Sequence, residues 1–136
     1  MRELIFTVYG PPVGKQRARS SSRSKRHFTP KKTVEYEKSV ARAAFDVVLK
    51  TPRYDPSEWT GTEQVYLDLW IYHANGRKPD SDNVVKAVED GLTGILWKDD
   101  RNVLPRVHHE YWPDDNPRVV VRIKPTGCNP GKKGKK

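Results

Sequence analysis

One stretch, from Lys78 to Val103, constrains the fold of this chain most, because it combines an amphipathic helix with a concentration of carboxylates. Ser81 or Asp82 can cap a helix over residues 83–93, since a short side-chain oxygen accepts from the unpaired amides of a first turn, and Gly94 can end it. Asp82, Lys86 and Asp90 share one face of this helix, and Val85, Val88 and Leu92 form an apolar stripe on a neighbouring face. We therefore expect one side to pack on a core and the other to remain available for chemistry.

Further carboxylates flank this helix, and we expect them to converge at one end of it. Asp80 precedes the helix, and Asp99 and Asp100 follow it after a turn. Carboxylate oxygens without a His or Cys cluster suit Mg²⁺ or Mn²⁺, which take octahedral oxygen ligands and retain several waters. The alternative is structural, with Asp80 and Asp82 capping the helix, Lys86 pairing along it and the later aspartates forming a turn. Spacing alone leaves both interpretations open.

Basic residues are concentrated in two segments. The formal net charge is +9, with 26 Lys and Arg against 17 Asp and Glu. Eight basic residues fall in residues 15–32 and four in residues 132–136, so the rest of the chain holds 14 bases and all 17 acids. Basic segments suit a polyanion because they neutralise phosphates and release counterions, although a solubilising tail is the alternative for residues 132–136. The candidate DNA-binding residues are Lys15, Arg17, Arg19, Arg23, Lys25, Arg26, Arg77 and Lys78.

Periodicity predicts the secondary structure around these segments. Alternating side chains predict strands at residues 3–9, 64–72, 103–112 and 118–124. Pro105 favours an edge or a bulge for the third of these. Thr29-Pro30 starts a helix that ends near Lys50, with a predicted buried stripe of Ala41, Ala44, Phe45, Val48 and Leu49. The order β-α-β-α-β-β predicts an α+β domain, in which a small mixed sheet has two helices on one face and an open face or edge for a homodimer.

Four other polar or aromatic residues invite a functional interpretation. Asp68 lies on the polar face of its predicted strand, where it is either solvated or near the site. His108 and His109 are adjacent in a strand, so they point to opposite faces and do not easily ligate one ion. Trp97 lies between the carboxylate-rich helix and Asp99, and we interpret it as an apolar anchor for the acidic turn.

Length and composition set the remaining limits. With 136 residues and a mean hydropathy of −0.87, the chain suits one domain with a modest core. We expect that domain at residues 1–125, with a mobile basic loop at 13–28 and a disordered basic tail at 126–136. A single cysteine, Cys128, excludes an internal disulfide and fits a reducing cytosol. No apolar run is long enough for a membrane span or a signal core, which predicts a cytoplasmic protein.

The carboxylate-rich stretch resembles the core motif of a known family. The pattern Pro-Asp-x-Asp-Asn-x-x-Lys, then Asp-Gly-Leu, then Trp-x-Asp-Asp-x-x-Val is similar to that of the RusA endonucleases, which resolve Holliday junctions. Its positions here are Pro79, Asp80, Asp82, Asn83, Lys86, Asp90, Gly91, Leu92, Trp97, Asp99, Asp100 and Val103. A weaker likeness extends upstream to residues 15–17, 28–30, 33 and 36–37. Gly91 stands where many members carry alanine, and the basic tail is outside the pattern.

The resemblance implies a homodimeric nuclease of bacterial or phage-encoded type that uses Mg²⁺, with Mn²⁺ as a substitute. Asp80, Asp82 and Asp100 match the family's metal-binding carboxylates, and Lys86 matches its catalytic lysine. The supporting positions are Asn83, Asp90, Trp97 and Asp99. Such an enzyme resolves four-way DNA by paired nicks during recombination and repair.

Two function classes are open on the residues themselves. The first is a metal-dependent endonuclease acting on branched DNA, and the second is a non-catalytic, basic nucleic-acid-binding module. A glycosidase-like use of the paired carboxylates would leave the basic segments without a purpose. Mg²⁺-dependent nicking of a four-way junction, abolished by Asp82→Asn, distinguishes the first two classes.

Overall fold

The chain forms an α+β fold, as the periodicity predicts. The computed structural model describes residues 3–15, 19–20, 27–28, 31–51, 64–97 and 100–126, with the backbone alone for 19–20, 27–28 and 100. The elements in chain order are β1 (Leu4–Tyr9), β2 (Arg19–Ser20), β3 (His27–Phe28), α1 (Lys31–Lys50), β4 (Val65–Tyr72), α2 (Ser81–Leu92), the 3-10 helix η2 (Asp100–Asn102), β5 (Val103–Tyr111) and β6 (Arg118–Pro125). Cys128 and the basic tail lie outside the described residues.

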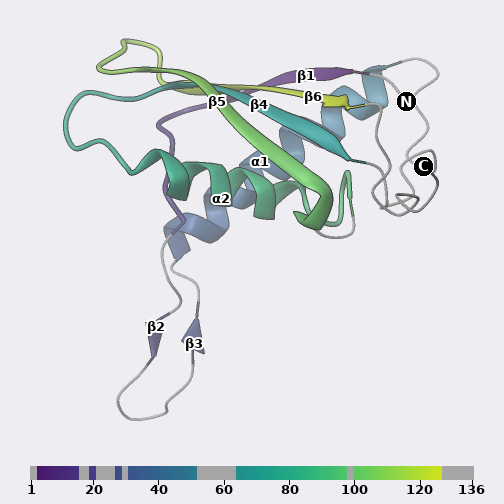
Figure 1. The fold of residues 1–136 in the computed structure, drawn as a ribbon. Coiled ribbons are helices and arrows are strands. Elements are labelled where there is room, and N and C mark those ends of the chain that lie inside the picture. The colour runs from purple at the N-terminus through teal and green to yellow at the C-terminus, as the bar shows by residue number, and fades with distance from the viewer. Residues whose placement is uncertain are drawn as a thin grey trace.

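Four strands form one mixed sheet in the order β1-β6-β4-β5 (Figure 1). β6 pairs antiparallel with both β1 and β4, while β5 runs parallel to β4 and is reached through α2. A parallel pair needs such a crossover, because its strands cannot be joined by a tight hairpin. β5 pairs with β4 alone, so the strand containing Pro105 is an edge strand, as predicted.

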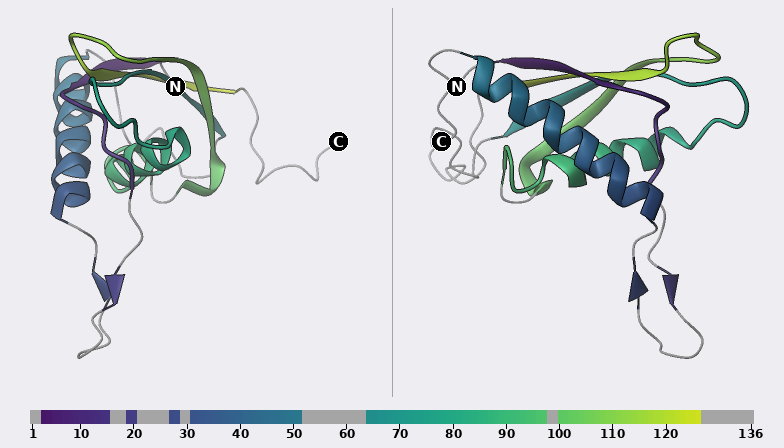
Figure 2. Two further views of the ribbon diagram at one scale, coloured as in Figure 1. Left: turned by 90° about the vertical axis from the view of Figure 1, so that its left-hand side faces the viewer. Right: turned by 180° about the vertical axis from the view of Figure 1, so that it is seen from behind.

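Both helices lie on the same side of the sheet (Figure 2). The helix-facing side chains of the two central strands are at most 2% exposed, namely Val65, Leu67, Leu69 and Ile71 of β4 and Val119, Val121 and Ile123 of β6. Full burial of each such side chain contributes roughly 1.5–3 kcal/mol to folding. The alternation read from the sequence therefore identifies the core of the sheet.

Helix α1 packs with a face that overlaps the predicted stripe only in part, because Ala44 is buried and Val48 partly buried as predicted. Phe45 and Leu49 are 52% and 68% exposed, and the buried positions are Thr33, Tyr36, Val40 and Ala44. Gly91 of α2 explains the choice of face, because it allows α1 to approach closely. A Cβ at Gly91 would lie 2.9 Å from the carbonyl oxygen of Glu37 and 2.9 Å from Val40 Cβ.

The predicted loop at residues 13–28 contains a small antiparallel ladder that the sequence did not predict. Arg19 pairs with Phe28 and Ser20 with His27. These two strands, β2 and β3, lie apart from the four-stranded sheet and extend beyond the start of α1 (Figures 1 and 2). Among the described residues, no helix is both long enough and apolar enough to cross a bilayer.

Candidate nucleic-acid and metal site at the start of helix α2

Asp80 occupies the N-cap position of α2, but its side chain does not cap the helix. The backbone of Asp80 is extended, with φ −64° and ψ 131°, and its carbonyl oxygen accepts from the amides of Asn83 and Val84 at 3.0 and 3.1 Å. The carboxylate makes no capping hydrogen bond, and the side chain is exposed. The helix begins at Ser81 rather than Asn83, so Ser81 and Asp82 lie in its first turn instead of at the cap. The capping alternative is therefore wrong for both aspartates.

Helix α2 divides into the two faces that its sequence predicts. Asp82 and Lys86 are exposed and Asp90 is partly exposed, while Val85, Val88 and Leu92 are buried. The helix ends at Leu92, and Gly94 follows with a left-handed φ of +92°. The buried face fixes the helix against α1 and the sheet, so the exposed face has a defined orientation.

Asp99 and the side chain of Asp100 lie outside the described part of the structure. Asp100 begins η2, directly before β5. Trp97 packs in the core at 7% exposure, and its Nε1 donates to Thr93 Oγ1 at 3.2 Å. Among the described side chains, no three His, Cys, Asp or Glu lie close enough to hold a metal ion. Convergence of Asp80, Asp82 and Asp100 on one ion therefore stays a prediction.

A cleft of about 590 Å³ adjoins the start of α2. Its lining includes Asp80 and four basic residues, Lys15, Lys32, Arg77 and Lys78. The remaining lining residues are Pro12, Val13, Gly14, Pro79 and Asn83. Lys32 was not among the predicted DNA-binding residues, although its place in the basic run of residues 15–32 was a usable signal. The cleft thus brings cations beside an unpaired carboxylate.

Lys15 is held by carboxylates from both helices. Its Nζ lies 2.8 Å from Glu37 Oε2 of α1 and 3.0 Å from Asp90 Oδ2 of α2. Burial lowers the pKa of Lys15, but the two carboxylates outweigh that effect and raise it above its ordinary value. The ion pair of Lys15 with Glu37 was not foreseen, and the weak motif likeness at residues 36–37 was the only signal for it.

Lys78 is linked to a buried histidine through Glu110 of β5. Nε2 of His73 donates to Glu110 Oε1 at 2.8 Å, and Lys78 Nζ lies 3.5 Å from the same oxygen. His73 is fully buried, and its Nδ1 has no hydrogen-bond partner among the described residues. Burial raises the pKa of Glu110, yet the bond from His73 and the charge of Lys78 bring it below its ordinary value. No sequence pattern pointed to His73 or Glu110.

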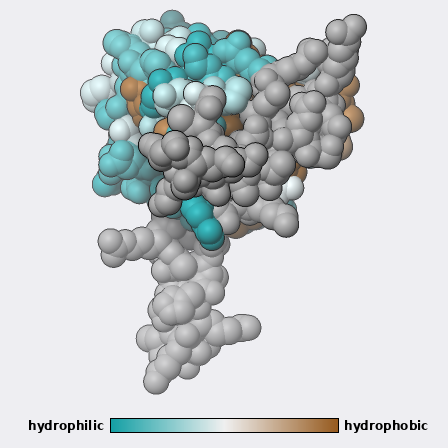
Figure 3. All heavy atoms as spheres, turned by 45° about the vertical axis from the view of Figure 1, so that its right-hand side comes forward, coloured by the Kyte–Doolittle hydropathy of each residue, from teal (hydrophilic) through white to brown (hydrophobic). Residues whose placement is uncertain are grey.

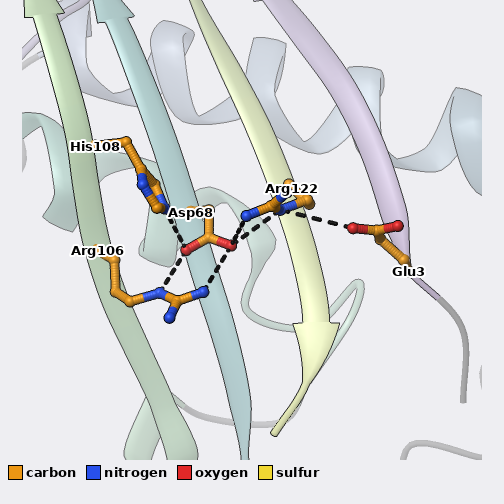
Figure 4. A network of polar contacts seen from close by, with 5 residues as sticks. All are labelled: Glu3, Asp68, Arg106, His108 and Arg122. Carbon is orange, nitrogen blue, oxygen red and sulfur yellow. Dashed lines mark hydrogen bonds and ion pairs between the residues drawn. The ribbon is translucent and has the colours of Figure 1, made fainter.

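Asp68 belongs to a separate network on the sheet face opposite the helices (Figure 4). It is 0% exposed, and its carboxylate accepts from Arg106 at 2.6 and 3.0 Å, from Arg122 at 2.9 and 3.0 Å and from His108 Nε2 at 2.9 Å. Burial raises its pKa, but these donors bring the pKa far below its ordinary value. Asp68 is thus neither solvated nor part of the α2 site, contrary to both sequence interpretations.

Aromatic rings extend this outer-face network. Arg106 lies 3.5 Å from the centre of the Tyr66 ring, and His108 stacks on Trp70 with ring centres 4.6 Å apart. His109, the next residue along β5, lies with its ring centre 4.2 Å from that of Tyr111. Figure 3 shows that hydrophilic residues cover most of the described surface in that view, with hydrophobic residues in smaller patches.

Most of the predicted DNA-binding side chains lie outside the described part of the structure. Arg17, Arg23, Lys25 and Arg26 lie outside the described residues, and Arg19 is described by its backbone in β2. Arg77 and Lys78 are exposed and line the cleft. The structure therefore locates one part of the predicted basic surface, beside Asp80.

Comparison with known proteins places this site in context. Residues 9–124 match the family model described as Endodeoxyribonuclease RusA. The chain is also similar to the uncharacterized protein YqaN of Bacillus subtilis strain 168, with 30% identity over 89% of this chain and 95% of that protein. The matched range contains both described helices, the cleft and every position of the carboxylate motif.

Proposed function

Because this chain belongs to the RusA endodeoxyribonuclease family, we propose that it is a Mg²⁺-dependent enzyme that resolves four-way DNA junctions by paired nicks. The observation that best supports this proposal is the closeness of unpaired carboxylates and basic side chains at the start of α2. The carboxylates of Asp80 and Asp82 make no hydrogen bond or ion pair to the described residues, and Asp80 lines a cleft that four basic residues also line.

The donor set suits a hard divalent cation. Asp80 and Asp82 would provide carboxylate oxygens from the start of α2, and Asp100 would add a third from η2. The lack of a capping bond at Asp80 supports this role, since its oxygens are not committed to the helix. Held by these residues, Mg²⁺ would supply an activated water and would neutralise charge on the phosphodiester, and Mn²⁺ is an expected substitute.

The chain's own residues would hold the DNA strand that is cut. Arg77, Lys78 and Lys32 line the cleft next to Asp80 and would bind backbone phosphates. The positive end of the α2 dipole also favours a phosphate there. Lys86 lies one turn after Asp82 on the exposed face, where we assign it to the charge that develops on the phosphate or the departing oxygen.

The remaining basic segment and a second copy would extend the site. Arg17, Arg19, Arg23, Lys25 and Arg26 would contact the phosphates of the junction arms. An isologous homodimer would present the same apparatus twice, which suits two nicks in a symmetric junction. We assign such an enzyme to DNA recombination and repair in the cytoplasm.

The test is cleavage of a labelled four-way junction by the full chain, with Mg²⁺ or with a chelator. We expect nicks only with the metal. Asp80→Asn and Asp82→Asn should each reduce the rate by at least about 100-fold, because charge stabilisation by a metal is worth several kcal/mol. Junction binding should persist or tighten, since a negative charge facing phosphate is lost.

Asp46→Asn is the matched control, because Asp46 is an exposed carboxylate of α1 that does not line this cleft. It should cut at the parental rate. If the parent protein binds junctions but does not nick them with Mg²⁺ or Mn²⁺, the enzyme assignment is wrong and the binding-module alternative stands. If Asp80→Asn and Asp82→Asn both cut normally, the site is elsewhere.

A further inference from the structure

The chain segment that leads into the β2–β3 hairpin is fastened to the start of α2. We call residues 16–30 the basic arm, and Gly14 and Lys15 its root. The amide of Lys15 donates to the carbonyl oxygen of Asn83 at 2.8 Å. A Cβ at Gly14 would lie 3.1 Å from Asn83 Cβ and 3.4 Å from Pro79 Cβ, so the root lies directly against the first turn of α2.

The ammonium of Lys15 adds a second attachment. It joins Glu37 of α1 at 2.8 Å and Asp90 of α2 at 3.0 Å. Helix α1 begins immediately after the basic arm, and Glu37 lies in its second turn. The Lys15 side chain therefore connects three parts of the chain: the root of the basic arm, helix α1 that follows the arm, and helix α2 that carries Asp82.

The charges argue against a phosphate contact by Lys15. One ammonium faces two carboxylates, so the cluster of Lys15, Glu37 and Asp90 has a formal charge of −1. The three side chains are only 27%, 21% and 31% exposed, so solvent screens this cluster less than it screens a fully exposed pair. A phosphate approaching Lys15 would meet both carboxylates, whereas Arg77 in the same cleft has no described carboxylate partner.

We propose that Lys15 is a positioning residue that holds both ends of the basic arm in register with the carboxylates of α2, and that it does not bind phosphate. The catalytic part of this inference rests on the proposed function. Loss of the attachment should leave the arm's own phosphate contacts in place. It should, however, allow the bound DNA to shift relative to Asp80 and Asp82, which lowers the cleavage rate even when all junction is bound.

The first measurement is the salt dependence of junction binding, without divalent metal. A lost phosphate contact lowers the slope of log K against log salt by about 0.9. We expect Lys15→Met to leave the slope unchanged, because methionine keeps the apolar stem and removes a charge that does not meet phosphate. Arg77→Met is the matched control, and its slope should fall by about 0.9.

The second measurement is hydrogen exchange at the amide of residue 15 in the free protein. Lys15→Met should speed this exchange at least about tenfold, because local opening of the root governs it. Lys15→Arg retains a cation that can span the two carboxylates, and it should keep most of the protection. This readout needs neither DNA nor activity, so it remains informative if the chain proves not to be a nuclease.

The third measurement is single-turnover cleavage with enzyme in excess. Lys15→Met should be at least about tenfold slower than the parent at saturation, and Lys15→Arg should recover most of the rate. A fall in the salt slope for Lys15→Met equal to that of Arg77→Met, with a normal rate at saturation, would overturn the proposal. Should Lys15→Met fail to fold, Glu37→Gln tests the same attachment from α1, and unchanged exchange at residue 15 in that variant would also overturn it.

Discussion

Two groups of aspartates in this protein differ in how fully they are paired. Asp68 lies in the outer face of the sheet, with no exposed surface and with hydrogen bonds from Arg106, Arg122 and His108. Asp80 and Asp82 lie at the start of α2, exposed and without a partner among the described residues. A carboxylate whose lone pairs are filled by cations supports the fold, because any new ligand must displace them. A carboxylate left open on a rigid helix can receive a ligand without that cost.

The pairing of a carboxylate therefore indicates its role better than its place in the sequence does. Asp68 shares a strand face with Tyr66 and Trp70, and Asp82 shares a helix face with Lys86 and Asp90, so both look like solvated polar positions. Only the tertiary structure shows that the carboxylate of Asp68 is fully hydrogen-bonded and that the carboxylate of Asp82 is available to a ligand. This comparison predicts that changes at the two places have opposite effects on stability and on activity.

The largest expected effect is a loss of junction-cleavage rate when Lys86 is replaced. Lys86→Ala should slow junction cleavage by about 100- to 1000-fold, the usual cost of removing one donor that stabilises transition-state charge. Its exposed position on α2 should keep the change in unfolding free energy within about 0.5 kcal/mol. Urea unfolding and single-turnover cleavage measure the two effects. Unfolding of the variant without a separate kinetic defect would return Lys86 to a structural role.

The next effect is on stability, at Asp68. Asp68→Asn should lower the unfolding free energy by about 3 kcal/mol, the low end for breaking a buried ion pair, because Arg106 and Arg122 retain contact with water. The rate per folded molecule should not change. Thr7→Ala on the same sheet face of β1 is a milder control. If fully folded Asp68→Asn cleaved more slowly than the parent, Asp68 would have a role in activity and the contrast with Asp80 and Asp82 would be wrong.

The pH dependence of the unfolding free energy tests whether the ionised carboxylate of Asp68 is the source of this stabilisation. The pKa of Asp68 is lower in the folded than in the unfolded state, so its stabilisation is present above the unfolded value of about 3.9 and is lost as pH falls toward the folded value. Between pH 4 and pH 3 the parent should lose about 1 kcal/mol more than Asp68→Asn does. Urea unfolding midpoints across this range provide the comparison. Equal losses would show that the carboxylate is not selectively stabilised when ionised.

A smaller effect is expected at Gly91, which sets the position of the open carboxylates indirectly. Gly91→Ala places a methyl group 2.9 Å from both the Glu37 carbonyl oxygen and Val40 Cβ, so α1 must move. We expect a loss of about 1–2 kcal/mol, within the usual range for overpacking, despite the better helix propensity of alanine. Thermal unfolding measures the loss, and Lys38→Ala on the exposed face of α1 is the control. If Gly91→Ala were more stable than the parent, α1 and α2 would not be in tight contact at this position.

Local periodicity was sufficient for much of the fold. Alternation located β1, β4 and β6, and the spacing of Val85, Val88 and Leu92 identified the buried face of α2. The motif around Asp80 and Lys86 identified the family, because its residues are close together in sequence. Each of these features depends on neighbours within a few turns or a few strand positions.

Features set by distant contacts were not predictable. Asp68 meets Arg106 and Arg122 across 38 and 54 positions, and Lys15 meets Glu37 across 22. On α1 the sequence predicted a buried stripe that contains Phe45, but the close approach of Gly91 places Val40 in the core and leaves Phe45 exposed. No single-chain pattern encodes such choices.

The position of β6 has a consequence for biosynthesis. It follows every other strand in the chain, yet it lies between β1 and β4 in the sheet. A nascent chain therefore exposes the unpaired edges of both strands until residues 118–125 have left the ribosome. A translation product that stops before this strand lacks the centre of the sheet, although its sequence already includes the whole carboxylate motif. Premature termination should thus yield a substrate for cellular proteases and not an unregulated nuclease.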